Sequence, residues 1–319
     1  MVSFVLRRLL EAIPIVFLST VVVFLLLHLL PGDPAQVLAG NDITPENLAR
    51  LRRDMGLDQP LPVQYWVWLS HILHGDLGQS PASRLPVSYL IGLALPVTIQ
   101  LTLAGMLLTV LVGVPLGILA ALHSGSIFEW FVLVFNGALL AIPGFWLSIL
   151  AILLFAVVLG WLPPGGFVSV ATDPVAGLQS LILPAATLAL PAAAALARQV
   201  RTAMLEVLHE DYVRTARAKG LRGASVVMRH ALRNAMLPVA TVLGLQFGRL
   251  LGGALITETI FTLPGVGRLL ISSINSRDYA VVQGALLLFM IAFTLINILT
   301  DVSYAVLDPR VRLAGGRSR

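Results

Sequence analysis

Long apolar segments separated by short polar ones dominate the 319 residues of this chain. Six of these segments approach or exceed the roughly 20 residues that a helix needs to cross the hydrocarbon core of a bilayer. They cover residues 9–30, 95–122, 130–161, 181–197, 237–256 and 284–307. The pattern therefore predicts an all-α membrane protein with six transmembrane helices, whose two ends lie on the same side of the membrane.

The first apolar segment also has a competing interpretation as a secretory signal peptide. The sequence Val-Leu-Ala at residues 37–39 resembles a small-residue cleavage site. However, the apolar core of a signal peptide has about 7–15 residues, and this segment is longer. We therefore expect an uncleaved first transmembrane helix.

A polar stretch after the first segment predicts a small extramembrane subdomain. It contains six acidic residues and four arginines. Thr44 and Pro45 predict the start of a helix, with the threonine as cap and the proline in the first turn, and this helix should continue to Met55. The predicted organisation is residues 1–30 as the amino terminus and first span, 31–93 as the subdomain, 94–306 as the membrane core with a loop at 198–236, and 307–319 as a tail.

Three aromatic residues of the subdomain allow two interpretations. Tyr65, Trp66 and Trp68 fall within four positions of one another. Tyrosine and tryptophan are enriched where a protein meets the membrane surface, so these side chains can belong to a surface helix. They can equally form the small core of the subdomain.

The loop between the fourth and fifth segments is polar. From Arg214 to Arg233 it carries six basic residues and no acidic one, so it must lie in water. A first helix is expected from Asp211 through Lys219, with the Asp211 carboxylate capping the first turn. Gly220 should end this helix, because glycine adopts the left-handed C-cap conformation most easily.

A second short helix is expected after this bend. Ser225 is a candidate cap for it, and Pro238 marks the entry into the next membrane segment. Arg229 and Arg233 are four positions apart and should share one face of the helix.

Composition and charge narrow the class of protein further. With 57% hydrophobic and 12% charged residues and a mean hydropathy of +0.90, the chain cannot be an ordinary soluble domain. The absence of cysteine excludes disulfides and thiolate chemistry. With the amino terminus inside, inner segments carry fourteen lysines and arginines and outer segments carry six. This bias predicts cytoplasmic termini.

Several stretches of the sequence resemble one known family. They are DYVRTARAKG and RHALRNAMLP in the polar loop, PGDPA, MGLDQPLPVQYWVWL and HGDLGQS after the first span, IFTLPGVGRLLISSINSRDYAVVQG after the fifth, and LDPRVRLAGG in the tail. These resemble the inner-membrane permeases of binding-protein-dependent ABC importers, in the dipeptide, oligopeptide and nickel branch. Arg214 and Thr215 stand where the generic EAA loop of such permeases has Glu-Ala, which is the usual form in this branch.

The resemblance implies a fold, partners and an energy source. The fold is that of a type I importer permease, placed in the cytoplasmic membrane of a prokaryote. The implied partners are a sister permease, expected as a hetero-pair, two ATP-binding-cassette ATPases and an extracytoplasmic substrate-binding protein, without nucleic acid. ATP and Mg²⁺ would be used by the ATPases, and no cofactor would be bound by this chain.

The resemblance also assigns residues to the coupling of ATPase and permease. These are Asp211, Tyr212, Arg214, Thr215, Ala216, Arg217, Lys219, Gly220, Leu221 and Arg222. A docking surface is expected from Tyr212, Ala216, Gly220 and Leu221. The three arginines of this set would meet acidic rims of the ATPases.

The fifth span contains a row of small residues and one charged residue that are candidates for specific roles. Gly244, Gly248 and Gly252 recur every four positions in the fifth span and predict close helix packing. Arg249 is the one charge deep in a span, and an ion there is expensive to bury in lipid. It either lines the translocation path and contacts a substrate carboxylate, or pairs with another helix or subunit.

The motifs that are absent argue against a catalytic role. The phosphate-binding pattern G-x-x-x-x-G-K-[ST] cannot occur, because Lys219 follows Ala218 and no other lysine exists. The six histidines show no metal-ligand spacing, so no metal site is expected. The main prediction is a non-enzymatic permease for di- and oligopeptides. Nickel chelates, glutathione or another small solute remain alternative cargoes, and a stand-alone secondary transporter is the alternative of a different class.

Overall fold

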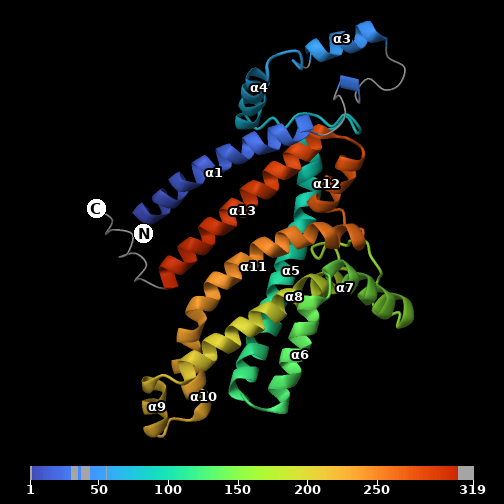
Figure 1. The fold of residues 1–319 in the computed structure, drawn as a ribbon. Coiled ribbons are helices and arrows are strands. Elements are labelled where there is room, and N and C mark those ends of the chain that lie inside the picture. The colour runs from blue at the N-terminus through green and yellow to red at the C-terminus, as the bar shows by residue number, and fades with distance from the viewer. Residues whose placement is uncertain (1, 30–34, 37–43, 55, 308–319) are drawn as a thin grey trace. The chain divides into compact units, whose positions relative to one another are not determined.

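The computed structural model describes residues 2–29, 35–36, 44–54 and 56–307. Within these ranges the chain is built from helices and contains one isolated β-bridge, between Gln79 and Pro86. The helices of Figure 1 are α1 (Val2–Leu29), α3 (Pro45–Asp54), α4 (Leu61–Leu73), α5 (Val87–Leu122), α6 (Ile127–Ala141), α7 (Gly144–Ala151), α8 (Pro174–Leu208), α9 (Asp211–Ala218), α10 (Gly223–Ser225), α11 (Leu232–Ile260), α12 (Val266–Asn275) and α13 (Tyr279–Leu307). Two π-helical segments, Ile152–Val158 and Val226–Ala231, follow α7 and α10.

The prediction of an all-α membrane protein is confirmed. Five helices in the described residues are long and apolar enough to cross a membrane, namely those of α1, α5, α8, α11 and α13. The remaining predicted span, residues 130–161, is a pair of helices bent by 103° between Ile127–Ala141 and Gly144–Val158. The bend has a local cause. Ile142 is extended (φ −77°, ψ 125°), because the following Pro143 disfavours a helical conformation at the residue before it.

The contacts divide the chain into two units. The first consists of residues Met1–Arg8, Ile99–Leu263 and Leu295–Arg319, and the second of Leu9–Thr98 and Pro264–Thr294. The first unit contains most of α5, the bent pair, α8, the polar loop and α11. The second contains most of α1 and the residues that follow it, together with α12 and the beginning of α13.

In the second unit, one of the three aromatic residues, Tyr65, lies in a small core, and Trp68 is half-buried against it. The Tyr65 side chain is buried and shares a hydrogen bond of 2.8 Å with the Thr20 hydroxyl of α1. The indole N–H of Trp68 donates to Gln283 Oε1 of α13 at 3.0 Å. Trp66 remains 59% exposed. The α4 helix is therefore attached to α1 and α13 through its aromatic side chains.

The helix start predicted at Thr44 is confirmed. Helix α3 begins at Pro45, and the Thr44 hydroxyl accepts a hydrogen bond from the backbone N–H of Asn47 at 3.4 Å. Met55, where this helix was expected to end, lies outside the described residues. Elsewhere in the second unit, the Ser80 hydroxyl donates to the buried Asp278 carboxylate, which also accepts from the Val281 N–H at 3.2 Å.

In the first unit, α8 is the helix against which α6, α7 and α11 pack, and α5 approaches it as well. Its close approach to α5 depends on glycines in α5. A Cβ at Gly117 would lie 2.6 Å from the Ala197 carbonyl oxygen, and one at Gly113 would lie 2.9 Å from that of Ala193. One at Gly105 would lie 3.1 Å from Leu188 Cδ2. The alanine-rich sequence of α8 supplies the complementary small surface.

Thr109 completes this row of small residues, since it lies four positions from both Gly105 and Gly113. Its buried hydroxyl donates to the Gly105 carbonyl at 2.8 Å and approaches the Ala189 carbonyl of α8 at 3.5 Å. The residues at 105, 109, 113 and 117 therefore form one continuous contact with α8.

We predict that Gly117→Ala destabilises the chain, because the added methyl group meets a backbone carbonyl that cannot rotate away. Overpacking of this kind costs about 1–3 kcal/mol. The matched control is Gly137→Ala in α6, where a Cβ meets no described atom within 4 Å. Thermal unfolding of the two purified variants in detergent measures the difference. An apparent Tm of the Gly117 variant equal to that of the control would contradict the packing argument.

Candidate functional site

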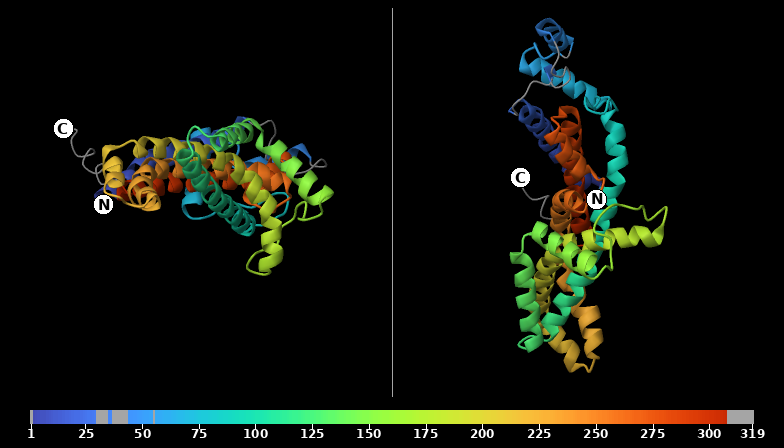
Figure 2. Two further views of the ribbon diagram at one scale, coloured as in Figure 1. Left: turned by 90° about the horizontal axis from the view of Figure 1, so that it is seen from below. Right: turned by 90° about the vertical axis from the view of Figure 1, so that its right-hand side faces the viewer.

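The polar loop between α8 and α11 is the candidate functional site. Helix α8 ends at Leu208, and α9 begins at Asp211 after two intervening residues. Figure 1 shows α9 and α10 at the ends of α8 and α11, and Figure 2 shows them at the same end of the first unit as the turn between α5 and α6. The loop is thus carried directly by the two helices that it connects.

Helix α9 has one buried face and one exposed face. Val213 and Ala216 are buried, and they form a small apolar cluster with Val226 after the bend. Val207 and Leu208 at the end of α8 pack against this cluster. The loop therefore folds on a core of its own that is continuous with the end of α8.

The bend after α9 is made as predicted at Gly220. This residue has φ +76°, the left-handed conformation that glycine adopts without steric cost. Its N–H donates to the Arg217 carbonyl at 2.9 Å, and the Leu221 N–H donates to the Ala216 carbonyl at 3.4 Å. A Cβ at Gly220 would meet no described atom within 4 Å, so only the backbone conformation demands glycine here.

The predicted cap at Asp211 is wrong. The capping position is Glu210, whose backbone is extended (φ −66°, ψ 145°) and whose side chain makes no capping hydrogen bond. Asp211 already lies in the first turn and forms an exposed ion pair of 3.4 Å with Arg214. Its negative charge still lies near the positive end of the helix dipole, which is a stabilising position, as the sequence predicted.

The predicted start of the second helix at Ser225 is also wrong. Helix α10 begins at Gly223, after an extended Arg222 whose carbonyl accepts the Ser225 N–H at 2.8 Å. Ser225 is therefore the last residue of α10. The helix continues through the π-helical segment into α11 and passes Pro238 without a break. The stretch that is apolar enough to cross a membrane begins at Pro238, so the predicted entry into the span is confirmed.

The exposed face of α9 and the bend present polar and apolar groups together. Tyr212 is 41% and Leu221 is 43% exposed. Arg214, Thr215, Arg217, Lys219 and Arg222 are also exposed. The Tyr212 hydroxyl accepts a hydrogen bond of 2.7 Å from Asn234 Nδ2, which ties the exposed face to α11.

Ala216 departs from the expectation for the docking surface. Its side chain points into the cluster with Val213 and Val226 and is buried. An alanine on the inner face of an amphipathic helix cannot contact a partner without unfolding the loop. Ala216 therefore supports the exposed surface from beneath.

The three glycines singled out in the fifth span occupy different environments in α11. A side chain at Gly244 would collide with Thr300 of α13, while Gly248 is half-buried. Gly252 is exposed, and a Cβ there would meet no described atom within 4 Å. The row in α5 was missed, although Gly113 and Gly117 show the same four-residue spacing that drew attention to α11.

Arg249 lies on a face of α11 that no described element covers. The neighbouring positions of this face, Leu245 and Ile256, are also exposed, whereas Gln246 and Leu250 are buried. Arg249 stands near the middle of the apolar stretch Pro238–Ile260. Among the described residues, Arg249 has no hydrogen-bond or ion-pair partner.

The described part of the chain also contains no cluster of three or more side chains that could hold a metal ion.

Comparison of the sequence with models of known protein families shows to which family this chain belongs. Residues 113–313 match the binding-protein-dependent transport system inner membrane component, and residues 1–102 match the amino-terminal domain of such membrane components. The chain belongs to this family. It is a multi-pass inner-membrane permease component of an ABC importer, as the resemblance implied.

Individual relatives agree with this assignment over nearly the whole chain. A permease protein of Brucella abortus (strain 2308), named for a peptide transport system, is 46% identical over 312 residues, which is 98% of this chain and 99% of the relative. The glutathione transport system permease protein of Salmonella paratyphi A is 44% identical with the same coverage.

A solved structure supports the fold. The MetNI methionine ABC transporter in an inward-facing conformation is 19% identical, with a TM-score of 0.56 over 69% of this chain and 97% of that chain. At this level of identity the likeness concerns the fold alone. It agrees with the predicted importer-permease fold.

Proposed function

We propose that this chain and a sister permease form the translocation path for di- and oligopeptides delivered by an extracytoplasmic substrate-binding protein. Two ATPase subunits would dock on the loop and use ATP and Mg²⁺. The observation that carries the proposal is the architecture of the loop, whose exposed basic face rests on its own apolar core at the end of α8. Such a rigid projection can transmit a push from a partner into a membrane helix.

The docking surface would consist of Tyr212, Gly220 and Leu221, surrounded by basic side chains. Aromatic and apolar side chains at the centre of an interface supply most of its binding energy. Charges at its rim mainly steer the partner and set the register. The exposed Arg214, Arg217, Lys219 and Arg222 would therefore select acidic rims on the ATPases.

The distribution of charge supports one orientation in the membrane. The excess of lysine and arginine in the loop and near both termini supports a cytoplasmic location for all three. The subdomain after α1 would then face the substrate-binding protein. This arrangement places the ATPases and the binding protein on opposite sides of the membrane.

Peptides are the cargo that the relatives favour. A relative named for peptide transport and one named for glutathione transport are similarly close, and glutathione is itself a tripeptide. Nickel chelates remain an alternative within the family. A stand-alone secondary transporter is the alternative of another class, and ATP-independent uptake driven by the proton gradient would support it.

We predict that Gly220→Val abolishes ATP-driven uptake and leaves membrane insertion intact. A left-handed conformation costs a non-glycine residue roughly 1–2 kcal/mol, and more for a β-branched one, so the bend must rearrange. The matched control is Gly223→Val in the same loop, which has an ordinary φ and an equally open environment. Uptake of radiolabelled trialanine and glutathione into cells compares the variants with the unaltered chain. Normal uptake by the Gly220 variant would contradict the coupling role.

The environment of Arg249 adds a proposal about substrate recognition. A guanidinium near the middle of an apolar span is too costly to leave in lipid, and no described element covers it. We propose that the uncovered face of α11 lines the path between the paired permeases. Arg249 would there contact the carboxylate of a passing peptide.

The substitution Arg249→Gln should raise the KM for peptides with a free carboxyl terminus about 10-fold or more, because a hydrogen bond to a charged group is lost. Uptake of a peptide amide should change far less. Arg249→Lys keeps the charge and should retain most of the preference for peptides with a free carboxyl terminus over peptide amides. If Arg249→Gln instead prevents the permeases from co-purifying and leaves the KM of assembled complexes unchanged, the arginine pairs with the sister subunit and the path proposal is wrong.

A further inference from the structure

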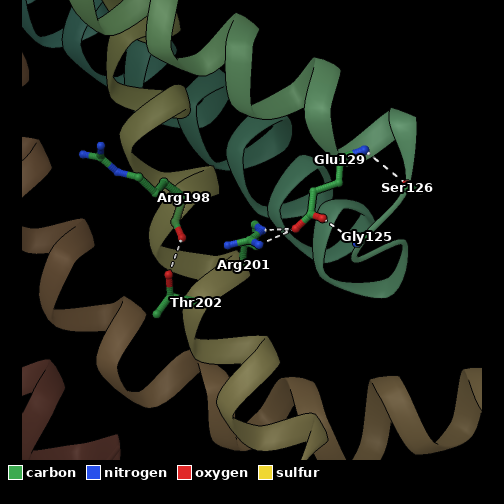
Figure 3. Close-up of polar contacts among 6 residues, drawn as sticks. All are labelled: Gly125, Ser126, Glu129, Arg198, Arg201 and Thr202. Carbon is green, nitrogen blue, oxygen red and sulfur yellow. Dashed lines mark hydrogen bonds and ion pairs between the residues drawn. The ribbon is translucent and has the colours of Figure 1, made fainter.

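A largely buried ion pair joins the first turn of α6 to α8. The structure extends α8 to Leu208, so this pair lies before the loop, although residue 201 falls within the range 198–236 predicted for it. Its acid is Glu129, in the first turn of α6, and its base is Arg201 of α8. Their side chains are only 9% and 23% exposed. Figure 3 shows the Arg201 guanidinium directed at the Glu129 carboxylate.

The carboxylate of Glu129 is first held by its own turn. Its Oε2 atom accepts the Gly125 N–H at 2.6 Å, and the Glu129 N–H donates to the Ser126 hydroxyl at 3.2 Å. This arrangement is close to a capping box, except that the carboxylate accepts the N–H of Gly125, the residue before the N-cap Ser126. The position of the carboxylate is therefore fixed relative to the α6 axis.

The other oxygen of the carboxylate is reserved for α8. Its Oε1 atom accepts from Arg201 Nε at 2.6 Å and also contacts Nη2 of the same side chain. Among the described residues of α6, Glu129 supplies the side-chain hydrogen bonds to α8. Val132, Asn136 and Leu139 are buried on the same face of α6. Packed helices can slide past each other in small steps, whereas a charge-assisted pair with two donors resists sliding.

The position of Arg201 along α8 connects this pair to the loop. Arg201 lies seven residues before the end of α8, about two helical turns from Leu208. Leu208 itself packs into the apolar cluster of the loop. Arg201 is therefore connected to the loop through the last two turns of α8.

On the other side of the pair, α6 leads to the bend at Ile142 and Pro143. The two arms of this bent pair are inclined by 103°. Proline fixes its own φ and restricts the residue before it, so the corner between the two arms is conformationally defined. Helix α6 thus carries the ion pair with α8 at one end and leads into the bend at the other.

From this arrangement we propose that Glu129 and Arg201 are positioning residues for coupling, which make α6 move as one body with α8 when a partner displaces α9. The inference rests on the proposed function of the loop and extends it to a residue pair outside the loop. Without the pair, α8 would slide along α6, and the motion would not reach the bent helix.

The test measures the distance between α6 and α8 in the assembled complex with and without trapped nucleotide. Spin labels are placed at Val134→Cys in α6 and Glu206→Cys in α8, both exposed positions in a chain without other cysteines. The permease complex, with accessible cysteines removed from the other subunits, is compared without nucleotide and with ATP and vanadate. Pulsed electron paramagnetic resonance gives the distance distributions.

In the otherwise unaltered chain, the distribution should stay the same in both states. With Glu129→Gln it should shift or broaden in the trapped state. Arg201→Lys, in a chain that keeps Glu129, preserves the positive charge. Its distance distribution should stay narrow in both states. The matched control is Arg198→Gln, because Arg198 is exposed on the same helix and points away from Glu129 in Figure 3.

Two results would overturn the proposal. One is a Glu129→Gln distribution that remains as narrow and constant as in the unaltered chain, and the other is an unaltered chain in which the distance already changes on trapping. Should Glu129→Gln fail to assemble, Arg201→Gln provides the same comparison. If the ATPases do not bind even the unaltered chain, the proposed function of the loop has failed, which is distinguishable because no trapped state then forms.

Discussion

The close contact between α5 and α8 is the packing on which the first unit depends. Lipid offers no hydrophobic advantage to helix association, so transmembrane helices gain their stability from close van der Waals contact. The glycines at 113 and 117 bring the α5 backbone against carbonyl groups of α8. This contact fixes α8, and α8 in turn carries the loop at one end and packs α6, α7 and α11 around it.

The loop is positioned by a second, smaller core. Val213, Ala216 and Val226 gather against the end of α8, so the exposed face of α9 has a defined direction relative to the membrane helix. The hydrogen bond between Tyr212 and Asn234 adds an attachment to α11. A displacement applied to α9 therefore acts on both flanking helices. The Glu129–Arg201 pair would extend this chain of rigid contacts to α6.

Much of the fold was predictable from the sequence because it follows from local rules. Apolar length gave the membrane helices, the preference of glycine for positive φ gave the bend at Gly220, and threonine followed by proline gave the start of α3. The two helix caps in the loop were wrong. Capping depends on which residue is extended, and Glu210 and Arg222 take that conformation although their side chains make no capping bond.

The contacts between helices could not be predicted from the sequence patterns. The glycine spacing in α5 and α11 is similar, yet only the structure shows that the α5 row meets α8 and that Gly252 meets nothing described. The burial of Ala216 and the pairing of Glu129 with Arg201, 72 positions apart, likewise require the folded chain. The sharp bend within residues 130–161 was hidden, because a Pro-Gly sequence inside an apolar segment allows either a kink or a break.

The most direct test of the central claim is mass spectrometry of the subunits that remain bound when the tagged chain is extracted from its native membrane in mild detergent. A second permease and ATP-binding-cassette ATPases should co-purify, and Leu221→Asp on the exposed face of the loop should release the ATPases while retaining the second permease. Recovery of the chain alone, together with uptake that needs no ATP, would contradict the account and favour a stand-alone transporter.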